Sequence, residues 1–338
     1  MKTIHISKSN SQGDFAIIKL KITEDKMIVS IIIPAYNAAK TIRETLKSAL
    51  EQKSPLFSTE IIIVDDGSTD ETLSILDEYK GTCRIIAQNN AGVSAARQAA
   101  FNVSRGDFIQ YLDSDDLLVP GKLAVQIESL LAHKADIAYG DFEEFVEENG
   151  EIIPKRLFEG EIKGNPMIEI FKAFWRPPGA LLYSRKICEK ISWSPTLFNT
   201  QDHRYFLDAV LACGKLVYTP GIQLKYRAFQ NHSLSQRNRT KFFKYCLVNI
   251  EEIYQVWKND FKYEPEKKEA ILETLQRTIR EVSEIDQPLT QQGIDLLLKI
   301  EPSYIPKKSL GLRLMSIVVG YRNAVKLAML KRSFKFNS

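Results

Sequence analysis

Cysteine is scarce in this chain of 338 residues, and the spacing of its cysteines argues against zinc sites and disulfide bonds. The four cysteines lie far apart and form no CxxC pair. The sequence therefore indicates neither a zinc site nor a disulfide framework. Unpaired thiols fit a reducing compartment, so we expect the protein to work in the cytoplasm.

Long apolar runs are also missing. No run approaches the ~20 residues that span a bilayer. The opening MKTIHISKSN lacks the apolar core of a signal peptide. Hydrophobic residues make up 44% of the chain and charged residues 26%, as is ordinary for a globular protein.

Acidic residues are absent from Pro302 to the C-terminus, while this tail carries eight basic residues: Lys307, Lys308, Arg313, Arg322, Lys326, Lys331, Arg332 and Lys335. Because the whole chain has a net charge of +4, residues 1–301 carry −4. The positive charge is thus confined to the tail, and we expect no nucleic-acid partner.

The tail also predicts a last helix, from about Leu310 to Arg332. Its apolar residues on one arc are Leu314, Ile317, Val318, Tyr321 and Val325. A basic amphipathic helix of this kind can lie on the inner, anionic face of the plasma membrane. A helix docked on its own catalytic domain has the same pattern, and both interpretations stay open.

The chain from residue 28 alternates short buried strands with helices. Strands are expected at 28–33, 60–64, 84–87 and 109–112, with helices from about Thr41, Ser68 and Ser94. We expect Pro34 to end the first strand and Ser68 with Glu71 to form a capping box. This order predicts a mostly parallel sheet flanked by helices. No GxGxxG follows the first strand, which argues against the usual dinucleotide cofactors.

Polar clusters follow each of these strands, where ligands bind in parallel sheets. They are Tyr36-Asn37, Asp65-Asp66, Asn89-Asn90 and Asp113-Ser114-Asp115-Asp116. The last gathers three carboxylates in four residues, and carboxylate oxygens suit Mg²⁺ or Mn²⁺. Alone, such a turn is more often a solvated surface, but four clusters at one sheet edge favour a binding site.

Four stretches resemble successive landmarks of the family 2 glycosyltransferases with the GT-A fold: VSIIIPAYNAAKTIRETLKSAL, EIIIVDDGSTDET, NNAGVSAAR and GDFIQYLDSDD. The resemblance covers about residues 28–236. It implies a GT-A fold and an inverting sugar transferase that uses a nucleotide-sugar donor and a divalent cation, Mn²⁺ or Mg²⁺. Because no QxxRW motif or transmembrane helix is present, we expect a non-processive enzyme.

The resemblance also implies residue roles. Asp66 accepts a hydrogen bond from the base, which favours uracil or thymine over cytosine because both present an imide N–H. Asp113 contacts the ribose or the metal, and Asp115 contacts the metal. The expected nucleotide-sugar contacts are Pro34, Ala35, Tyr36, Asp66, Arg97, Asp113 and Ser114.

The second half of the family region adds further candidates. The loop with Trp175, Pro178 and Gly179 is expected beneath the donor sugar and acceptor, where Trp175 either stacks on a sugar or packs internally. Asp202 matches the family's general base, although Gln201 replaces the usual acid before it. Without this context Asp202 would be read as a helix N-cap. We expect His203 to pack or face solvent.

A further segment resembles one that carries a diphosphate-binding histidine in the family. Arg227 matches it, but Phe229 occupies the histidine's place and His232 comes three residues later. Arg227 and His232 are therefore candidate diphosphate contacts, with a surface histidine as the alternative interpretation of His232.

We thus expect an extension at 1–26, a GT-A domain at 27–236 and a helical extension at 237–338. The expected function is transfer of one sugar, from a UDP-sugar before others, to a glycan or lipid-linked acceptor of a cell-surface glycan such as lipopolysaccharide. The alternatives are an inactive nucleotide-sugar-binding protein and a nucleotidyltransferase, although the latter usually has a Gly-rich phosphate loop after the first strand.

Overall fold

The computed structural model describes residues 5–7, 19–21, 26–148, 150–228, 238–307 and 309–336, and side chains only up to residue 330 in the last of these ranges. The chain divides into two compact units. One comprises Met1–Ile162, Trp175–Pro195 and Tyr205–Phe229; the other comprises Lys163–Phe174, Thr196–Arg204 and Gln230–Ser338. The helical unit therefore takes two short segments from the middle of the chain as well as the predicted C-terminal extension.

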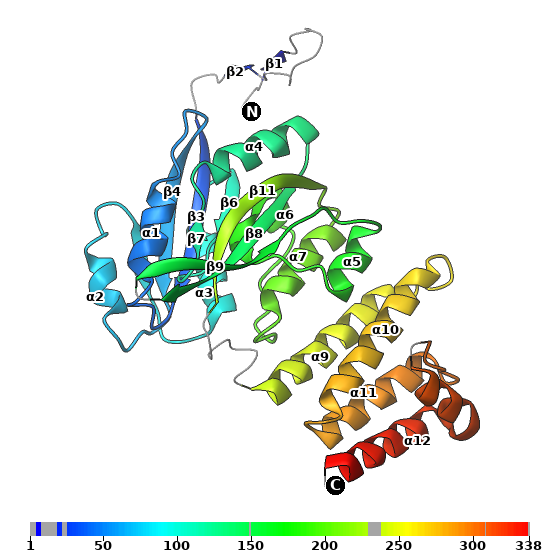
Figure 1. Ribbon diagram of the computed structural model, residues 1–338. Helices are drawn as coiled ribbons and strands as arrows, with labels where there is room; N and C mark the ends of the chain where they lie inside the picture. The colour runs from blue at the N-terminus through cyan, green and yellow to red at the C-terminus, as the bar shows by residue number, and fades with distance from the viewer. Residues whose placement is uncertain are drawn as a thin grey trace. The chain divides into compact units, whose positions relative to one another are not determined.

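The first unit is built on a mixed sheet (Figure 1). Its order is β5-β4-β3-β6-β10-β8-β11-β7, with β9 paired to β8. β5, β4, β3 and β6 run parallel, as do β8 and β11, whereas β10 is antiparallel to both its neighbours. The strands are β3 (Met27–Ala35), β4 (Phe57–Asp65), β5 (Arg84–Ala87), β6 (Phe108–Tyr111), β7 (Leu117–Leu118), β8 (Ile137–Glu148), β9 (Glu151–Phe158), β10 (Leu181–Ser184) and β11 (Leu216–Arg227). A separate two-stranded sheet pairs β1 (His5–Ser7) with β2 (Lys19–Lys21).

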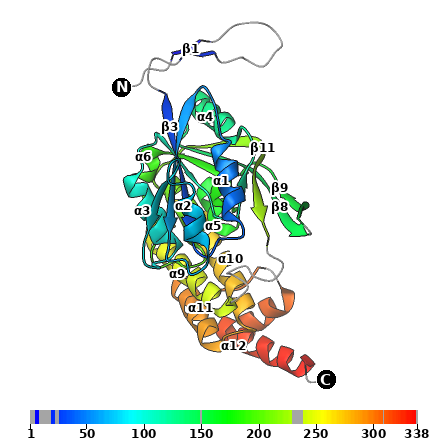
Figure 2. The same ribbon diagram turned by 90° about the vertical axis from the view of Figure 1, so that its left-hand side faces the viewer.

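Helices cover both faces of this sheet. Figure 2 shows α1 on one side of β3 and β4 and α3 on the other. The helices of this unit are α1 (Ile42–Leu50), α2 (Thr72–Asp77), α3 (Val93–Val103), α4 (Lys122–His133), α6 (Arg185–Cys188) and most of α7 (Gln201–Leu211). The mostly parallel, doubly covered sheet predicted from the sequence is confirmed.

The centre of the sheet is β3, whose isoleucines at 31, 32 and 33 have no exposed surface. Full burial stabilises by about 1.5–3 kcal/mol per side chain of this size. The prediction that Pro34 ends the strand was wrong, because β3 continues through Pro34, which pairs with Val64 of β4. On the other side the ladder with β6 stops at Ile32, so the N–H that proline lacks is not needed there.

The predicted capping box was also wrong. α2 begins at Thr72, and Asp70 accepts the N–H of Thr72 at 3.0 Å. The hydroxyl of Ser68 accepts instead the N–H of Asn37, at 3.0 Å. A contact with another loop has therefore replaced the local cap.

The second unit contains α5 (Pro166–Lys172), α9 (Arg239–Trp257), α10 (Pro265–Val282), α11 (Gln287–Ile300) and α12 (Leu310–Phe336). Its core includes Trp257, which is 1% exposed and lies edge-on against Phe171. Across the described residues, no helix has the length and apolar character that crossing a membrane requires.

The last helix does not present the single apolar arc that the sequence predicted. α12 is kinked at Gly320, whose φ is 76°. Beyond the kink, Tyr321 and Val325 are buried, and the Tyr321 ring lies 5.1 Å from that of Tyr304. The C-terminal half of α12 therefore docks within its own unit, while apolar side chains before the kink are exposed.

A glycine is required where the chain turns into β6. A Cβ on Gly106 would lie 2.4 Å from the backbone nitrogen of Ser30, whereas a Cβ on Gly81 would meet nothing within 4 Å. We expect Gly106→Ala to lower the free energy of unfolding by about 1–3 kcal/mol, as measured by urea denaturation. Gly81→Ala is the matched control and should be no less stable than the wild type; equal effects of the two substitutions would contradict the steric argument.

Candidate functional site

The loops after β3 and β4 are tied together by Asn37. Its backbone N–H donates to Ser68, and its side-chain oxygen accepts the N–H of Thr69 at 2.8 Å. Pro34 and Ala35, two of the predicted nucleotide contacts, are buried at the end of β3. Tyr36, the third, is 51% exposed and offers an accessible ring.

Asp66 fastens the loop after β5 to the same edge. Its carboxylate accepts hydrogen bonds from the Gln88 side chain at 2.7 Å and from the N–H groups of Ala91 and Gly92 at 2.9 and 2.8 Å. Gly67 next to it has a φ of +78°, and a Cβ there would lie 2.9 Å from the backbone nitrogen of Asn90. Asp66 is 3% exposed, so this predicted base contact also shapes the loop around it.

Arg97 joins α3 to the acidic turn after β6. Its guanidinium forms an ion pair with Asp113 and lies 4.3 Å from the ring centre of Trp193. Trp193 in turn stacks on Tyr205 at 4.0 Å. The stacked rings of Trp193 and Tyr205 thus pack against Arg97 and hold it beside the Asp113 carboxylate.

Two donors of Arg97 lack a protein partner. The side chain is 2% exposed, yet Nε and Nη1 donate to no group within the described residues. Burying unpaired N–H groups of a charged side chain is costly. The face of the Trp193 ring, 4.3 Å from the guanidinium, offsets part of this cost by a cation–π contact.

The acidic turn itself is crowded with negative charge. Asp113 and Asp115 are half-buried and Asp116 is fully buried. Burial and the neighbouring Asp113 carboxylate raise the pKa of Asp115 to about 7. Burial, with Asp115 and Asp113 nearby, raises the pKa of Asp116 well above its usual range. The turn therefore favours a positively charged ligand.

A complete metal cage is not formed by protein groups alone. In the described part of the chain, no three His, Cys, Asp or Glu side chains are grouped so as to hold a metal ion. Mg²⁺ sites commonly use one or two carboxylates and take other ligands from phosphates and water. Asp113 and Asp115 fit that partial role.

Arg227 lies beneath the acidic turn. Its Nε donates to the carbonyl of Asp115 at 2.9 Å, and its guanidinium forms ion pairs with Glu44 and Glu147. Its predicted diphosphate contact stays a prediction. His232 lies outside the described residues.

The predicted sugar loop is mostly internal. Pro178 and Gly179 are buried in a 3₁₀ turn, and a Cβ on Gly179 would lie 2.4 Å from Cδ1 of Leu224. Trp175 is half-buried and lies edge-on against Phe142 and Tyr226, at 5.5 and 5.6 Å. Trp175 thus has the packing role that was one of its two interpretations; contact of this loop with a sugar stays a prediction.

Asp202 stands in the first turn of α7, in the part of the helix that belongs to the second unit. Its Oδ1 accepts the N–H of His203 at 2.9 Å. The His203 ring contacts the carbonyl of Ile170, and burial lowers its pKa. His203 therefore packs, as one of its two interpretations had it, and the catalytic role of Asp202 stays a prediction.

Four residues of this region were not predicted from the sequence: Glu44, Gln88, Glu147 and Trp193. Each acts through a partner distant in sequence, such as Glu44 with Arg227, 183 positions away. Only Gln88 carried a signal, since it directly follows the predicted strand 84–87.

Comparisons with known proteins agree with this geometry. Residues 30–192 match the family model described as glycosyl transferase family 2. The chain is 40% identical over 117 residues to the UDP-Glc:alpha-D-GlcNAc-diphosphoundecaprenol beta-1,3-glucosyltransferase WfaP of Escherichia coli, covering 34% of this chain and 46% of the relative. It is 30% identical over 199 residues to the poly(ribitol-phosphate) beta-glucosyltransferase of Bacillus spizizenii, covering 56% of this chain and 30% of the relative. The chain thus spans less than half the length of either relative.

A solved structure extends the likeness in fold. S. aureus TarS 1-349, in complex with UDP-GlcNAc, has a TM-score of 0.68 at 20% identity, covering 91% of this chain and 92% of that one. Residues 30–192 are thus similar to glycosyl transferase family 2, and the chain has the fold of TarS, the GT-A fold.

Proposed function

We propose that the protein transfers one sugar from a UDP-sugar to a hydroxyl group of a glycan or lipid-linked acceptor, inverting the anomeric centre and releasing the product after each transfer. The observation that carries this proposal is the convergence of Asp66, the Arg97–Asp113 ion pair and the acidic turn at one edge of the sheet. A cation on the acidic turn would bind the diphosphate oxygens of the donor.

Asp66 supports a uracil base. A carboxylate offers about four acceptor sites, and Asp66 uses three of them on protein donors. The remaining site suits one imide N–H, which uracil and thymine have and cytosine lacks. The names of the relatives favour UDP-sugars, because one names UDP-Glc as its donor.

The acceptor class rests on the relatives alone. One carries in its name a lipid-linked sugar diphosphate and another a poly(ribitol-phosphate). We therefore infer a cytoplasmic role in surface polysaccharide synthesis, lipopolysaccharide included, with hydroxyl groups of such polymers as acceptors.

A divalent cation fits the acidic turn. Asp113 and Asp115 would hold Mn²⁺ or Mg²⁺ together with the diphosphate, and Ser114 would lie beside it. A bound cation supplies Lewis-acid stabilisation of the leaving diphosphate. The crowding of three carboxylates in this turn supports the assignment.

Asp202 is the proposed general base. Its carboxylate would take the proton of the acceptor hydroxyl as that oxygen attacks the anomeric carbon. The bond from this carbon to the β-phosphate oxygen breaks at the same time, and its electron pair leaves with UDP. One carboxylate suffices for this displacement, which accommodates glutamine at position 201.

A screen of nucleotide sugars by thermal unfolding tests the donor. A ligand at a hundred times its Kd stabilises by ~2.7 kcal/mol, so UDP-sugars with Mn²⁺ should raise Tm while CDP-sugars leave it unchanged. A wild-type protein that responds to no UDP-sugar would overturn the proposal. Binding without any transfer would favour the alternative of a nucleotide-sugar-binding protein.

Membrane contact is a further part of the proposal. Before the kink in α12, Leu310, Leu314, Ile317 and Val318 are 72%, 56%, 59% and 82% exposed. No acidic residue follows Pro302. Apolar surface and positive charge together favour an anionic bilayer surface, where each basic residue contributes about 1 kcal/mol.

We expect the triple variant Leu314→Ser, Ile317→Ser, Val318→Ser to lose most of its binding to anionic vesicles. Co-sedimentation with phosphatidylglycerol and phosphatidylcholine vesicles, at low and high salt, measures it. The matched control is Val256→Ser with Tyr263→Ser, which removes apolar side chains that are 53% and 79% exposed elsewhere in the same unit. If the wild-type chain ignores anionic vesicles, this surface does not bind membranes.

A further inference from the structure

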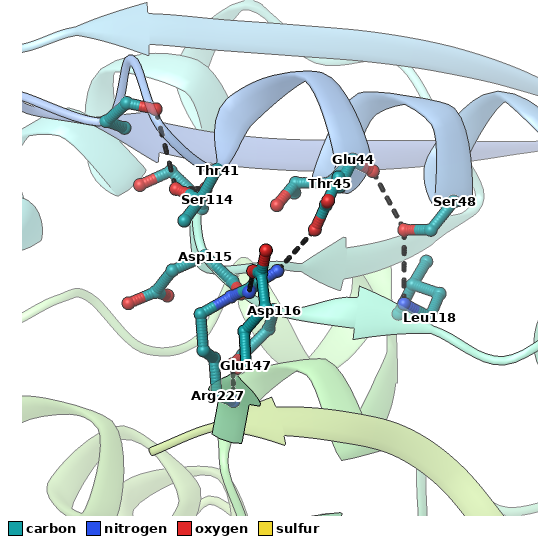
Figure 3. A network of polar contacts seen from close by, with 11 residues as sticks. Thr41, Glu44, Thr45, Ser48, Ser114, Asp115, Asp116, Leu118, Glu147 and Arg227 are labelled. Atoms are coloured by element: carbon teal, nitrogen blue, oxygen red, sulfur yellow. Dashed lines mark hydrogen bonds and ion pairs between the residues drawn. The ribbon is translucent and has the colours of Figure 1, made fainter. Parts of the chain in front are cut away.

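The acidic turn is held from below by Arg227, which ends β11. Its side chain is 3% exposed, and all three of its guanidinium nitrogens donate to protein groups. Nε holds the carbonyl of Asp115 at 2.9 Å, and its backbone N–H holds the carboxylate of Asp116, also at 2.9 Å. Nη1 and Nη2 reach Glu147 of β8 and Glu44 of α1, as Figure 3 shows.

The same turn is held from the other side by neutral groups of α1. The hydroxyl of Thr41 donates to the carbonyl of Ser114 at 2.8 Å, and that of Ser48 accepts the N–H of Leu118 at 3.2 Å (Figure 3). Thr41, Glu44 and Ser48 are three and four residues apart, so they share one face of the helix. That face therefore contacts the acidic turn through Thr41, Arg227 through Glu44 and strand β7 through Ser48.

The carboxylates of this cluster outnumber its guanidinium groups. Its connected groups include five carboxylates and two guanidinium groups: Asp113, Asp115, Asp116, Glu44, Glu147, Arg97 and Arg227. Arg227 is paired with Glu44 and Glu147, and Arg97 with Asp113, so within the described residues neither guanidinium forms an ion pair with Asp115 or Asp116. Arg227 thus fixes the turn through hydrogen bonds and leaves the carboxylate of Asp115 available to a cation.

We propose that Arg227 is the positioning residue of the acidic turn and that Glu44 and Glu147 are its counter-charges. This inference rests on the proposed function, since it concerns the same cation and diphosphate. Arg227 orients Asp115 and Asp116 before the ligands arrive and does not itself touch the diphosphate. It therefore differs from the direct diphosphate contact expected from the sequence.

Calorimetry on the full chain separates the two roles. UDP is titrated with EDTA and with Mn²⁺, and uridine is titrated with Mn²⁺. In Arg227→Met, the gain in UDP affinity from Mn²⁺ should fall by about 10- to 100-fold, the usual effect of losing a group that orients metal ligands. UDP affinity in EDTA and uridine affinity should equal those of the wild type.

The matched control is Arg185→Met. Arg185 likewise holds backbone at one end of β6, donating Nε to the carbonyl of Gly106 at 2.6 Å, but at the end opposite the acidic turn. Arg185→Met should show the same gain in UDP affinity from Mn²⁺ as the wild type. Should Arg227→Met fail to fold, Arg227→Lys serves instead, because lysine keeps the charge but cannot form the planar fork to two carboxylates. In Arg227→Lys the gain in UDP affinity from Mn²⁺ should also fall, while UDP affinity in EDTA should equal that of the wild type.

Two results would overturn the inference while the proposed function stands. One is an undiminished Mn²⁺ gain in the Arg227 variants. The other is an equal loss of UDP affinity with and without Mn²⁺ at unchanged uridine affinity, which would make Arg227 a direct diphosphate contact. A wild-type chain that fails to bind UDP would overturn the proposed function and this inference with it.

Discussion

Asp115→Ala is expected to abolish the Mn²⁺-dependent part of UDP binding. The carboxylate stands half-buried in the turn after β6, beside Asp113, and burial together with that neighbouring carboxylate raises its pKa. Of the two proposed metal ligands, Asp113 and Asp115, the variant keeps only Asp113. Titration of UDP in the presence and absence of Mn²⁺ should then give one and the same affinity.

The variant should keep its fold, because removing one of two carboxylates that repel each other relieves the turn. Its Tm without ligand should therefore be no lower than that of the wild type. Asp77→Ala, which removes an exposed carboxylate at the end of α2, is the control and should leave the Mn²⁺ effect intact. An unchanged Mn²⁺ effect in Asp115→Ala would remove Asp115 from the metal site.

The order of strands and helices could be predicted from the sequence because each element carries its own local pattern. The strand at 84–87 was predicted to the residue, and α1 begins at Thr41 as its N-cap, as expected. Errors arose where a tertiary contact overrode the local rule. Pro34 continues a strand because β6 has already ended beside it, and Ser68 caps no helix because it binds Asn37.

The candidate site was predictable only as a location. Polar residues after successive parallel strands must meet at one edge, and the contacts of Asp66, Arg97 and Asp113 follow from that convergence. The residues that support Asp66, Arg97 and Asp113 were not predictable. Glu44 lies on a helix face that reads as solvated, and its partner Arg227 comes from a strand 183 residues later.

The division into two units was equally hidden. Segments 163–174 and 196–204 belong to the helical unit although the family resemblance runs through both. Their grouping depends on contacts such as Phe171 with Trp257 and Arg204 with Asn249, which join distant parts of the chain. No local pattern encodes such pairs.

The second large effect is expected for Asp202→Asn. This variant should bind UDP-sugar with wild-type affinity and transfer the sugar ~10²-fold or more slowly, the usual scale for removing a general base. Asparagine has the same shape and can still accept the N–H of His203 that Asp202 accepts at 2.9 Å. It cannot take a proton from a hydroxyl group, so the loss should appear in kcat rather than in donor affinity.

Lipid-linked sugar diphosphates and poly(ribitol-phosphate) are the acceptors to use, with UDP release as the readout. Asp208→Asn, on the same helix α7, is the matched control and should turn over at the wild-type rate. A helix-capping role for Asp202 predicts a different result, since asparagine caps as well as aspartate and turnover would be preserved. Near-normal transfer by Asp202→Asn would therefore assign Asp202 to the helix start and require another base for the acceptor.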